Sequence, residues 1–156
     1  MLTQAPDRQS LQGFQQYRFG MSEQKIRTTT QINDSSSEEG NVRLKAADTT
    51  QVDGAAYQLS FLLKDGKLYR VNLLRESSAR VPNCDGLFER IFGLVRAKYG
   101  APDKEPEVTN VSGISQLSSA RFTFRDGGII NTSTLYLKQK CTVSVAYTAG
   151  MKGGLF

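Results

Sequence analysis

The sequence predicts an α+β fold in which two helices pack on one face of a curved antiparallel sheet. Three observations indicate this class: a long amphipathic helix pattern near the middle of the chain, alternating apolar runs on both sides of it, and short turn sequences between those runs. Short turns join antiparallel strands, whereas parallel strands need long crossovers. The order helix, strands, helix, strands is compatible with a tandem α-β-β-β repeat, with units of about 14–76 and 83–148.

The length of 156 residues is typical of one domain. We expect a flexible N-terminal arm over residues 1–13, a single α+β domain over residues 14–148, and a C-terminal tail over residues 149–156. The apolar fraction of 38% is enough for one core. No apolar run is long enough to cross a bilayer, so the sequence predicts no transmembrane segment.

The stretch FGMSEQKI (residues 19–26) predicts the start of the first helix. Ser22 is the expected N-cap, and Glu23 suits the positive end of the helix dipole. A phosphate-binding loop is the alternative, but the stretch has one glycine and no lysine in P-loop spacing. The helix should fade by Ile32, because the polar sequence of residues 33–40 indicates a flexible loop.

Three strands are predicted after this helix, at residues 42–46, 57–63 and 69–73, and the dipeptide Asp65-Gly66 indicates a hairpin between the last two. A three-residue loop, Lys64-Asp65-Gly66, would place Phe61 opposite Tyr69 and collect the alternating apolar residues on one face. We therefore expect Gly66 in a left-handed conformation at a bulge.

The strongest helix pattern is CDGLFERIFGLVRAKYG (residues 84–100). Asp85 or Asn83 is the expected N-cap, and Gly100 is the expected stop, followed by Pro102. Apolar residues recur at helical spacing and mark one buried face. They are Leu87, Phe88, Ile91, Phe92, Val95 and Tyr99.

After this helix the pattern predicts an extended connection with an early strand, and then strands at 120–124, 129–137 and 141–148. A three-residue loop at residues 138–140 would pair Leu137 with Cys141, again placing apolar residues opposite one another.

The net charge of +5 allows acidic partners, but acidic residues are interspersed among the basic ones. Arg121 and Arg125 flank two phenylalanines, which resembles a base-stacking strand. Strand alternation places Phe122 and Phe124 on one face and the arginines on the other, so a core face and a solvent face are favoured over a nucleic-acid platform.

The chain has no histidine, which excludes Ser-His-Asp and Cys-His catalysis and histidine-containing zinc sites. Carboxylates such as Asp65 and Asp126 are the remaining acid–base candidates, and both lie in predicted turns. The sequence therefore predicts no catalytic, metal or cofactor site and favours a protein that is not an enzyme. A hydrolase that uses carboxylates alone is a weaker alternative.

Two cysteines are present, Cys84 before the long helix and Cys141 at the start of the last strand. A helix packed across the sheet would bring them together, and a disulfide there would stabilise the fold by about 3–4 kcal/mol in the chain-entropy model. A disulfide would also indicate an oxidising compartment. Two separate thiols, or a reactive nucleophile, are the alternatives.

Two short motifs resemble small bacterial envelope domains. Gly20-Met21-Ser22, with Ile26 four residues on, and Tyr99-Gly100-Ala101-Pro102 are similar to the helix boundaries of the small lipoprotein of the outer-membrane assembly machinery and of the β-lactamase-inhibitor-protein-like fold. The resemblance implies a helix against an antiparallel sheet, in exported proteins that bind partners without catalysis. Asn83-Cys84-Asp85-Gly86 departs from this pattern, and no lipid-anchoring cysteine lies near residue 1.

Together these features favour a periplasmic or secreted protein, with its signal peptide already removed, that binds a protein or another envelope component. We expect a monomer or weak dimer without cofactors. A cytosolic basic module that binds RNA or another polyanion is the alternative function.

Overall fold

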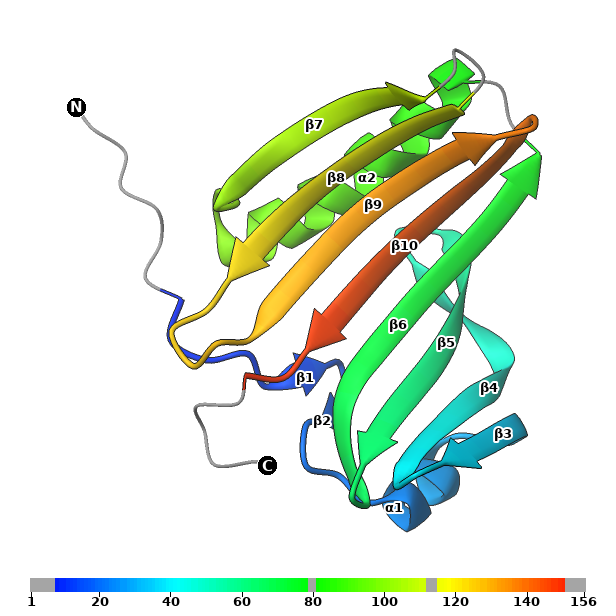
Figure 1. Cartoon of the computed structure of the whole chain (residues 1–156), viewed down its shortest axis with the longest axis vertical. Coiled ribbons are helices and arrows are strands. Elements are labelled where there is room, and N and C mark those ends of the chain that lie inside the picture. The colour runs from blue at the N-terminus through cyan, green and yellow to red at the C-terminus, as the bar shows by residue number, and fades with distance from the viewer. Residues whose placement is uncertain (1–7, 79–80, 112–114, 151–156) are drawn as a thin grey trace.

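The computed structural model describes residues 8–78, 81–111 and 115–150, and it has an α+β architecture built mainly of antiparallel sheet (Figure 1). The described helices are α1 (Glu23–Thr29) and α2 (Val81–Tyr99). A small ribbon pairs β1 (Gly13–Phe14) with β2 (Tyr17–Arg18). The main sheet contains β3 (Ile32–Glu38), β4 (Asn41–Val52), β5 (Ala55–Lys64), β6 (Lys67–Ser78), β7 (Lys104–Val111), β8 (Ser115–Thr123), β9 (Ile129–Leu137) and β10 (Lys140–Thr148).

The eight strands of the main sheet lie in the order β3-β4-β5-β6-β10-β9-β8-β7, and every neighbouring pair is antiparallel. Each helix is followed by a meander of four strands, where the sequence predicted units of three. The last strands of the two meanders, β6 and β10, pair at the centre, with Thr148 opposite Arg70 and Cys141 opposite Ser77. Helix α2 packs across β8, β9 and β10, while α1 lies near the ends of the strands of the other half (Figure 1).

Helix α1 begins as the sequence predicts but is shorter. The Ser22 hydroxyl accepts a hydrogen bond from the Lys25 backbone N–H at 3.2 Å, which caps the first turn, and Ile26 is fully buried. The helix ends at Thr29, and Ile32 already belongs to β3. The expected loop at residues 33–40 is therefore limited to the turn at Glu39 and Gly40, and the prediction is wrong for residues 33–38. This segment is an edge strand, which pairs with β4 on one side only, so its polar side chains can face solvent without the usual apolar alternation.

Two-residue turns, and not the predicted three-residue loops, close the main hairpins. Asp65 and Gly66 both have positive φ angles, 52° and 80°, so Gly66 is left-handed as expected but sits in a tight turn. Lys138 and Gln139 also have positive φ, at 52° and 63°, and β9 is offset by one residue from the prediction.

The pairing of β5 with β6 also differs from the prediction. The register shifts by one residue beyond Leu63, so that Phe61 lies opposite Val71 and not opposite Tyr69. A bulge within the strand, rather than a longer loop, brings the apolar residues of both strands onto one face.

Helix α2 starts earlier than predicted, at Val81, so Asp85 lies inside the helix and is not its cap. Pro82 fits this earlier start because the first turn needs no intrahelical N–H bond. At the other end Gly100 has φ 88°, and its N–H donates to the Arg96 carbonyl at 2.7 Å. Gly100 thus ends the helix in the left-handed conformation that the sequence predicts.

The described part of the N-terminal segment packs on the domain, although the sequence predicts a loose arm over residues 1–13. The buried Arg8 guanidinium donates hydrogen bonds to the carbonyls of Thr123, Tyr99 and Ala101 at 2.8–3.0 Å and pairs with Asp103. Arg8 therefore joins the end of α2 to the end of β8. Residues 1–7, and residues 151–156 of the predicted C-terminal tail, lie outside the described residues.

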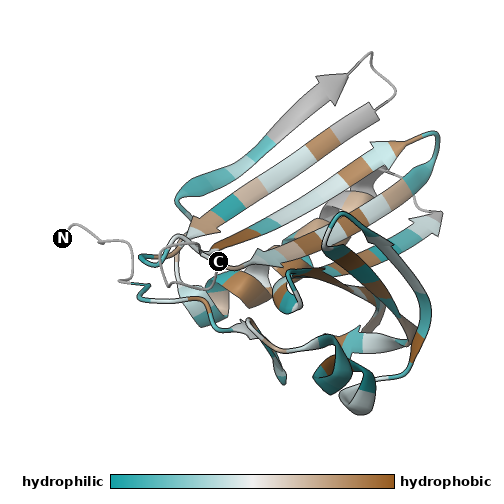
Figure 2. Cartoon of the chain, turned by 60° about the horizontal axis from the view of Figure 1, so that its bottom comes forward, coloured by the Kyte–Doolittle hydropathy of each residue, from teal (hydrophilic) through white to brown (hydrophobic). Residues whose placement is uncertain are grey.

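One hydrophobic core joins both halves of the sheet. Hydrophobic and hydrophilic bands alternate along the strands (Figure 2), as expected for a sheet with one buried face. The largest fully buried side chains include Phe61, Phe122, Ile26, Leu44 and Ile130, which come from both halves.

Candidate binding face

The sheet has a face opposite α2, which we call the open face. Cys141 bonds to Cys84 of α2, and the ring of Phe122 lies 5.9 Å from that of Phe92 of α2, so β10 and β8 direct these residues toward the helix. Because side chains alternate along a strand and directly paired residues share a face, the registers assign the remaining positions. The residues of the open face include Asp34, Glu38, Arg43, Lys45, Gln58, Ser60, Leu62, Arg70, Asn72, Leu74, Glu76, Leu117, Arg121, Asn131, Ser133, Leu135, Leu137, Thr142 and Ser144.

Exposed leucines occupy the β7–β10 side of this face and its centre. Leu117 and Leu135 lie directly opposite each other on β8 and β9, and Leu135 is 40% exposed. Leu137 and Leu74 are exposed to a similar extent, 39% and 38%. Exposed leucines grouped on one face are typical of a contact surface, whereas isolated ones are ordinary.

The residues of β9 that alternate with its outward-facing side chains, and point to the other side of the sheet, include polar ones. Thr132 and Thr134 of β9 face α2 and are buried, and their hydroxyls have no hydrogen-bond partner among the described residues. Folding stability alone would favour leucine inward and threonine outward on this strand, because an unpaired buried hydroxyl costs about 1–3 kcal/mol. The stability of this strand therefore does not explain the inversion.

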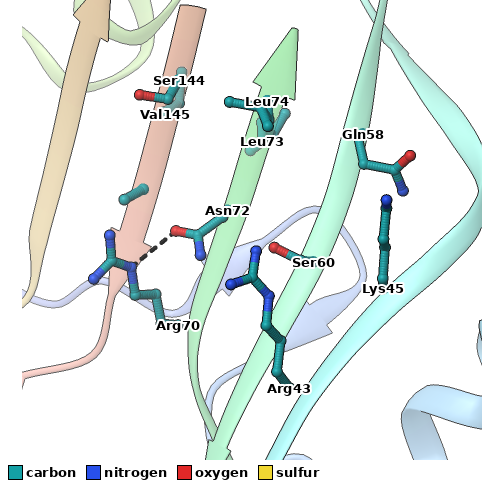
Figure 3. A pocket seen from close by; sticks show the side chains of 11 residues that line it. Arg43, Lys45, Gln58, Ser60, Arg70, Asn72, Leu73, Leu74, Ser144 and Val145 are labelled. Atoms are coloured by element: carbon teal, nitrogen blue, oxygen red, sulfur yellow. Dashed lines mark hydrogen bonds between the residues drawn. The ribbon is translucent and has the colours of Figure 1, made fainter. Parts of the chain in front are cut away.

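A hollow of about 290 Å³ lies on the other half of the open face, over β4, β5, β6 and β10 (Figure 3). Arg43 and Lys45 reach it from β4, Arg70 from β6, and Leu74 lines its upper end. Neutral polar groups separate the cations: Gln58, Ser60, Asn72 and Ser144. None of the described lining residues carries a carboxylate.

The cations of the hollow have no acidic partner within ion-pair distance in the described chain. Arg70 donates from Nε to the Asn72 side-chain oxygen at 2.8 Å, which holds its guanidinium beside the hollow (Figure 3). Arg43 and Lys45 are exposed and take part in none of the described ion pairs. Asp34 of β3 lies opposite Lys45 and lines a neighbouring hollow with it. The hollow therefore carries a surplus of positive charge, with three cations in its lining and Asp34 beside it.

A second hollow, of about 250 Å³, lies beside α2 and is mainly apolar. Phe14 and Tyr147 stack at its edge, with ring centroids 5.1 Å apart, and Leu94 and Lys98 contribute from α2. Burial, with a smaller contribution from Tyr99, raises the pKa of Tyr147 well above its usual value, so this phenol stays protonated. The second hollow lacks the grouping of cations that marks the first.

The structure brings together the two cysteines that the sequence singled out. Cys84 and Cys141 form a disulfide, which confirms the favoured pairing, and both are buried. The bond joins the first turns of α2 to β10, next to the central strand pair. Ser22 caps α1, Gly66 lies in the β5–β6 turn, Gly100 ends α2, and Asp85 lies within α2, so the structure does not bring these four residues together.

The predicted acid–base candidates do not come together. Asp65 lies in the β5–β6 turn, and Asp126 lies in the β8–β9 turn, where its carboxylate accepts bonds from the Gly128 and Leu11 backbone N–H groups. Phe122 and Phe124 are buried and Arg121 is exposed, as strand alternation predicts. Among the described residues no group of three or more acidic or cysteine side chains is arranged to hold a metal ion.

Sequence reasoning did not single out the residues of the open face. The cations of the hollow lie far apart in sequence, so only the register of β4, β5 and β6 brings them together. The turn dipeptides Asp53-Gly54 and Asp65-Gly66 were the available signal, because both form two-residue turns with positive φ. Reading Asp53-Gly54 as a turn would have extended β4 beyond its expected end at residue 46.

No described helix is long and apolar enough to span a membrane. Comparisons with protein-family models, curated proteins and solved structures found no match.

Proposed function

We propose that this chain is an exported, non-enzymatic domain that binds another protein through the open face. The polarity inversion of β9 carries the proposal: Leu135 is exposed while its neighbour Thr134 is buried at 3% exposure. A surface that combines exposed leucines with a flanking charged region has the composition of a protein interface, in which an apolar centre is bordered by polar groups.

Export is supported by the disulfide, because such bonds persist in oxidising compartments and are rare in the cytosol. We therefore propose a periplasmic or secreted location, in line with the resemblance of the helix boundaries to small envelope domains. The tandem repeat belongs to the same proposal, supported by the two helix-plus-four-strand segments whose last strands pair.

The binding surface is tested by a photo-reactive amino acid placed on either face, in the protein expressed in its native host. Asn131 lies on the open face and Glu89 on α2, and both are exposed. We expect a discrete adduct at Asn131 that excess unlabelled domain competes away, and little adduct at Glu89. Adducts confined to Glu89, or absent at both positions, would contradict the proposal.

The compartment is tested separately by thiol titration of denatured, unreduced protein from its native host. We expect no free thiol, because Cys84 and Cys141 are bonded. Two titratable thiols would count against export.

The basic hollow favours a second candidate, a cytosolic module that binds RNA or another polyanion. Affinity for heparin or RNA that falls steeply with salt would support it, because phosphate contacts release counterions. Absence of retention at low salt would exclude it.

A further inference from the structure

We propose that the basic hollow binds carboxylates of an acidic protein segment whose apolar residues contact Leu74 and Leu135. The inference rests on the proposed function and adds the chemistry of the partner. It is carried by the geometry of the cations, by the absence of a described ion pair to any of the three, and by the exposed Leu74 at the edge of the hollow.

The register spaces the cations for more than one carboxylate. Arg43 and Arg70 lie opposite the same residue, Leu62, from its two sides. Two strand spacings place their backbones about 10 Å apart. Lys45 follows two residues along β4 on the same face and lies opposite Ser60. The three cations therefore form a triangle over the hollow, each within reach of a ligand lying across the strands.

The two guanidinium groups of this triangle have N–H donors that no described residue uses. Arg70 uses Nε to bind Asn72, and no described residue accepts from its terminal nitrogens. Arg43 makes no described side-chain hydrogen bond, and its guanidinium points toward Ser60 and Asn72 (Figure 3). A guanidinium with two free N–H groups matches a carboxylate in a bidentate arrangement. Binding a carboxylate here would satisfy charges that the fold leaves unpaired.

The surroundings favour a protein segment over a nucleic acid. None of the described lining residues is aromatic, so the hollow offers no surface for base stacking. The apolar residues of the lining are aliphatic, and the exposed one among them, Leu74, suits an apolar side chain of a protein. Acidic residues next to apolar ones in a partner would match both parts of the open face.

Asp34 gives the hollow an internal competitor. It lies opposite Lys45 on the edge strand and is the described carboxylate that shares a hollow with Arg43 and Lys45. Removing its charge should strengthen binding of an acidic ligand. If Asp34 and Lys45 served only to hold β3 against β4, removing the charge of Asp34 would not strengthen binding.

The experiment is an NMR titration, at low salt, of the isotope-labelled domain with its Cys84–Cys141 disulfide intact. The probes are decaglutamate, decaglutamine and a ten-nucleotide single-stranded DNA. We expect decaglutamate to shift signals of Ser60, Asn72 and their neighbours on β4–β6, and decaglutamine to leave them unchanged.

Two variants with equal loss of charge separate specific binding from general attraction. Arg43→Gln with Arg70→Gln should weaken decaglutamate binding at least about tenfold. Arg96→Gln with Lys98→Gln, on α2, should change it less than about twofold. Asp34→Asn should strengthen it by roughly two- to fivefold.

Three results would overturn the inference: no shift at low salt, equal weakening by both double variants, or tighter binding of the DNA at the same residues. The last result would assign the hollow to nucleic acids. Adducts at Asn131 together with any of these results would leave the open face as the binding surface and reject only its proposed chemistry.

Discussion

The two faces of the sheet use neighbouring residues of the same strands for different purposes. On β6, Leu73 is 2% exposed on the side of the sheet that bears α2, which we call the covered face, while Leu74 is 38% exposed on the open face. On β9 the contrast is inverted, with threonines buried and leucines exposed. The comparison shows that burial of apolar residues on the covered face holds the fold together, and we propose that the exposed leucines of the open face contact a partner.

The largest expected effect on the covered face is loss of the disulfide. Replacing Cys84 and Cys141 with alanine should lower the free energy of unfolding by about 4 kcal/mol, because the 57-residue separation is no longer closed in the unfolded chain. Urea denaturation measures this change, and reduction of the unchanged protein should give a similar loss. A loss below about 1 kcal/mol would show that packing of α2 alone holds the two elements together.

The neighbouring leucines of β6 give the sharpest matched pair. Leu73→Ala should cost about 3 kcal/mol, since it leaves a cavity in the core, whereas Leu74→Ala should cost less than about 1 kcal/mol. The measurement is the unfolding midpoint of each variant under the same conditions. Equal losses would mean that the open face also supports the fold and would remove the basis of the comparison.

A smaller effect concerns acid stability at the anchor of the N-terminal segment. Burial alone would raise the pKa of Asp103, but the hydrogen bond from the Thr123 N–H and the charge and hydrogen bond of Arg8 outweigh it, so the pKa lies below its usual value. A lowered carboxyl pKa adds stability above the unfolded-state pKa, and this contribution disappears as the pH falls through the folded-state pKa.

Asp103→Asn should therefore be less stable than the unchanged protein at pH 6, and the gap should narrow between about pH 4 and pH 2. Unfolding curves across this pH range provide the test. A gap that stays constant with pH would exclude a contribution from the carboxylate charge.

The buried threonines give the smallest effect and the opposite sign. Thr134→Val keeps the side-chain shape and removes a buried hydroxyl that has no described partner, so it should raise stability by about 1 kcal/mol. Ser133→Ala, on the open face of the same strand, is the contrast, because its hydroxyl does have a partner, the Ser144 hydroxyl at 2.7 Å, and its removal should lower stability by about 0.5–1.5 kcal/mol. A loss of stability in Thr134→Val would show that the hydroxyl does have a partner.

The sequence predicted what local patterns determine. The apolar face of α2 follows from its helical spacing, and Ser22 and Gly100 mark helix ends through ordinary capping chemistry. The cysteine pairing followed from the expected packing of the helix across the sheet. Strands β9 and β10 were located within a residue of their observed bounds.

The remaining features depend on contacts between distant segments. The pairing of apolar with apolar residues in the last hairpin was wrong because its turn has two residues, which places Leu137 opposite Lys140 and directs Leu135 outward. The edge strand at residues 32–38 was missed because its partner β4, and not its own composition, makes it a strand. The candidate site was missed for the same reason, since Arg43 and Arg70 meet only through the register of three strands.

The division between the two faces is tested most directly by replacing three open-face leucines, Leu74, Leu117 and Leu135, with threonine in the domain carrying the photo-reactive residue at Asn131. We expect the free energy of unfolding to change by less than about 1 kcal/mol while the adduct yield falls at least about tenfold, because apolar anchors dominate binding. An unchanged adduct yield would contradict the assignment of the open face as the binding surface. So would a variant that is strongly destabilised while its folded molecules still form the adduct.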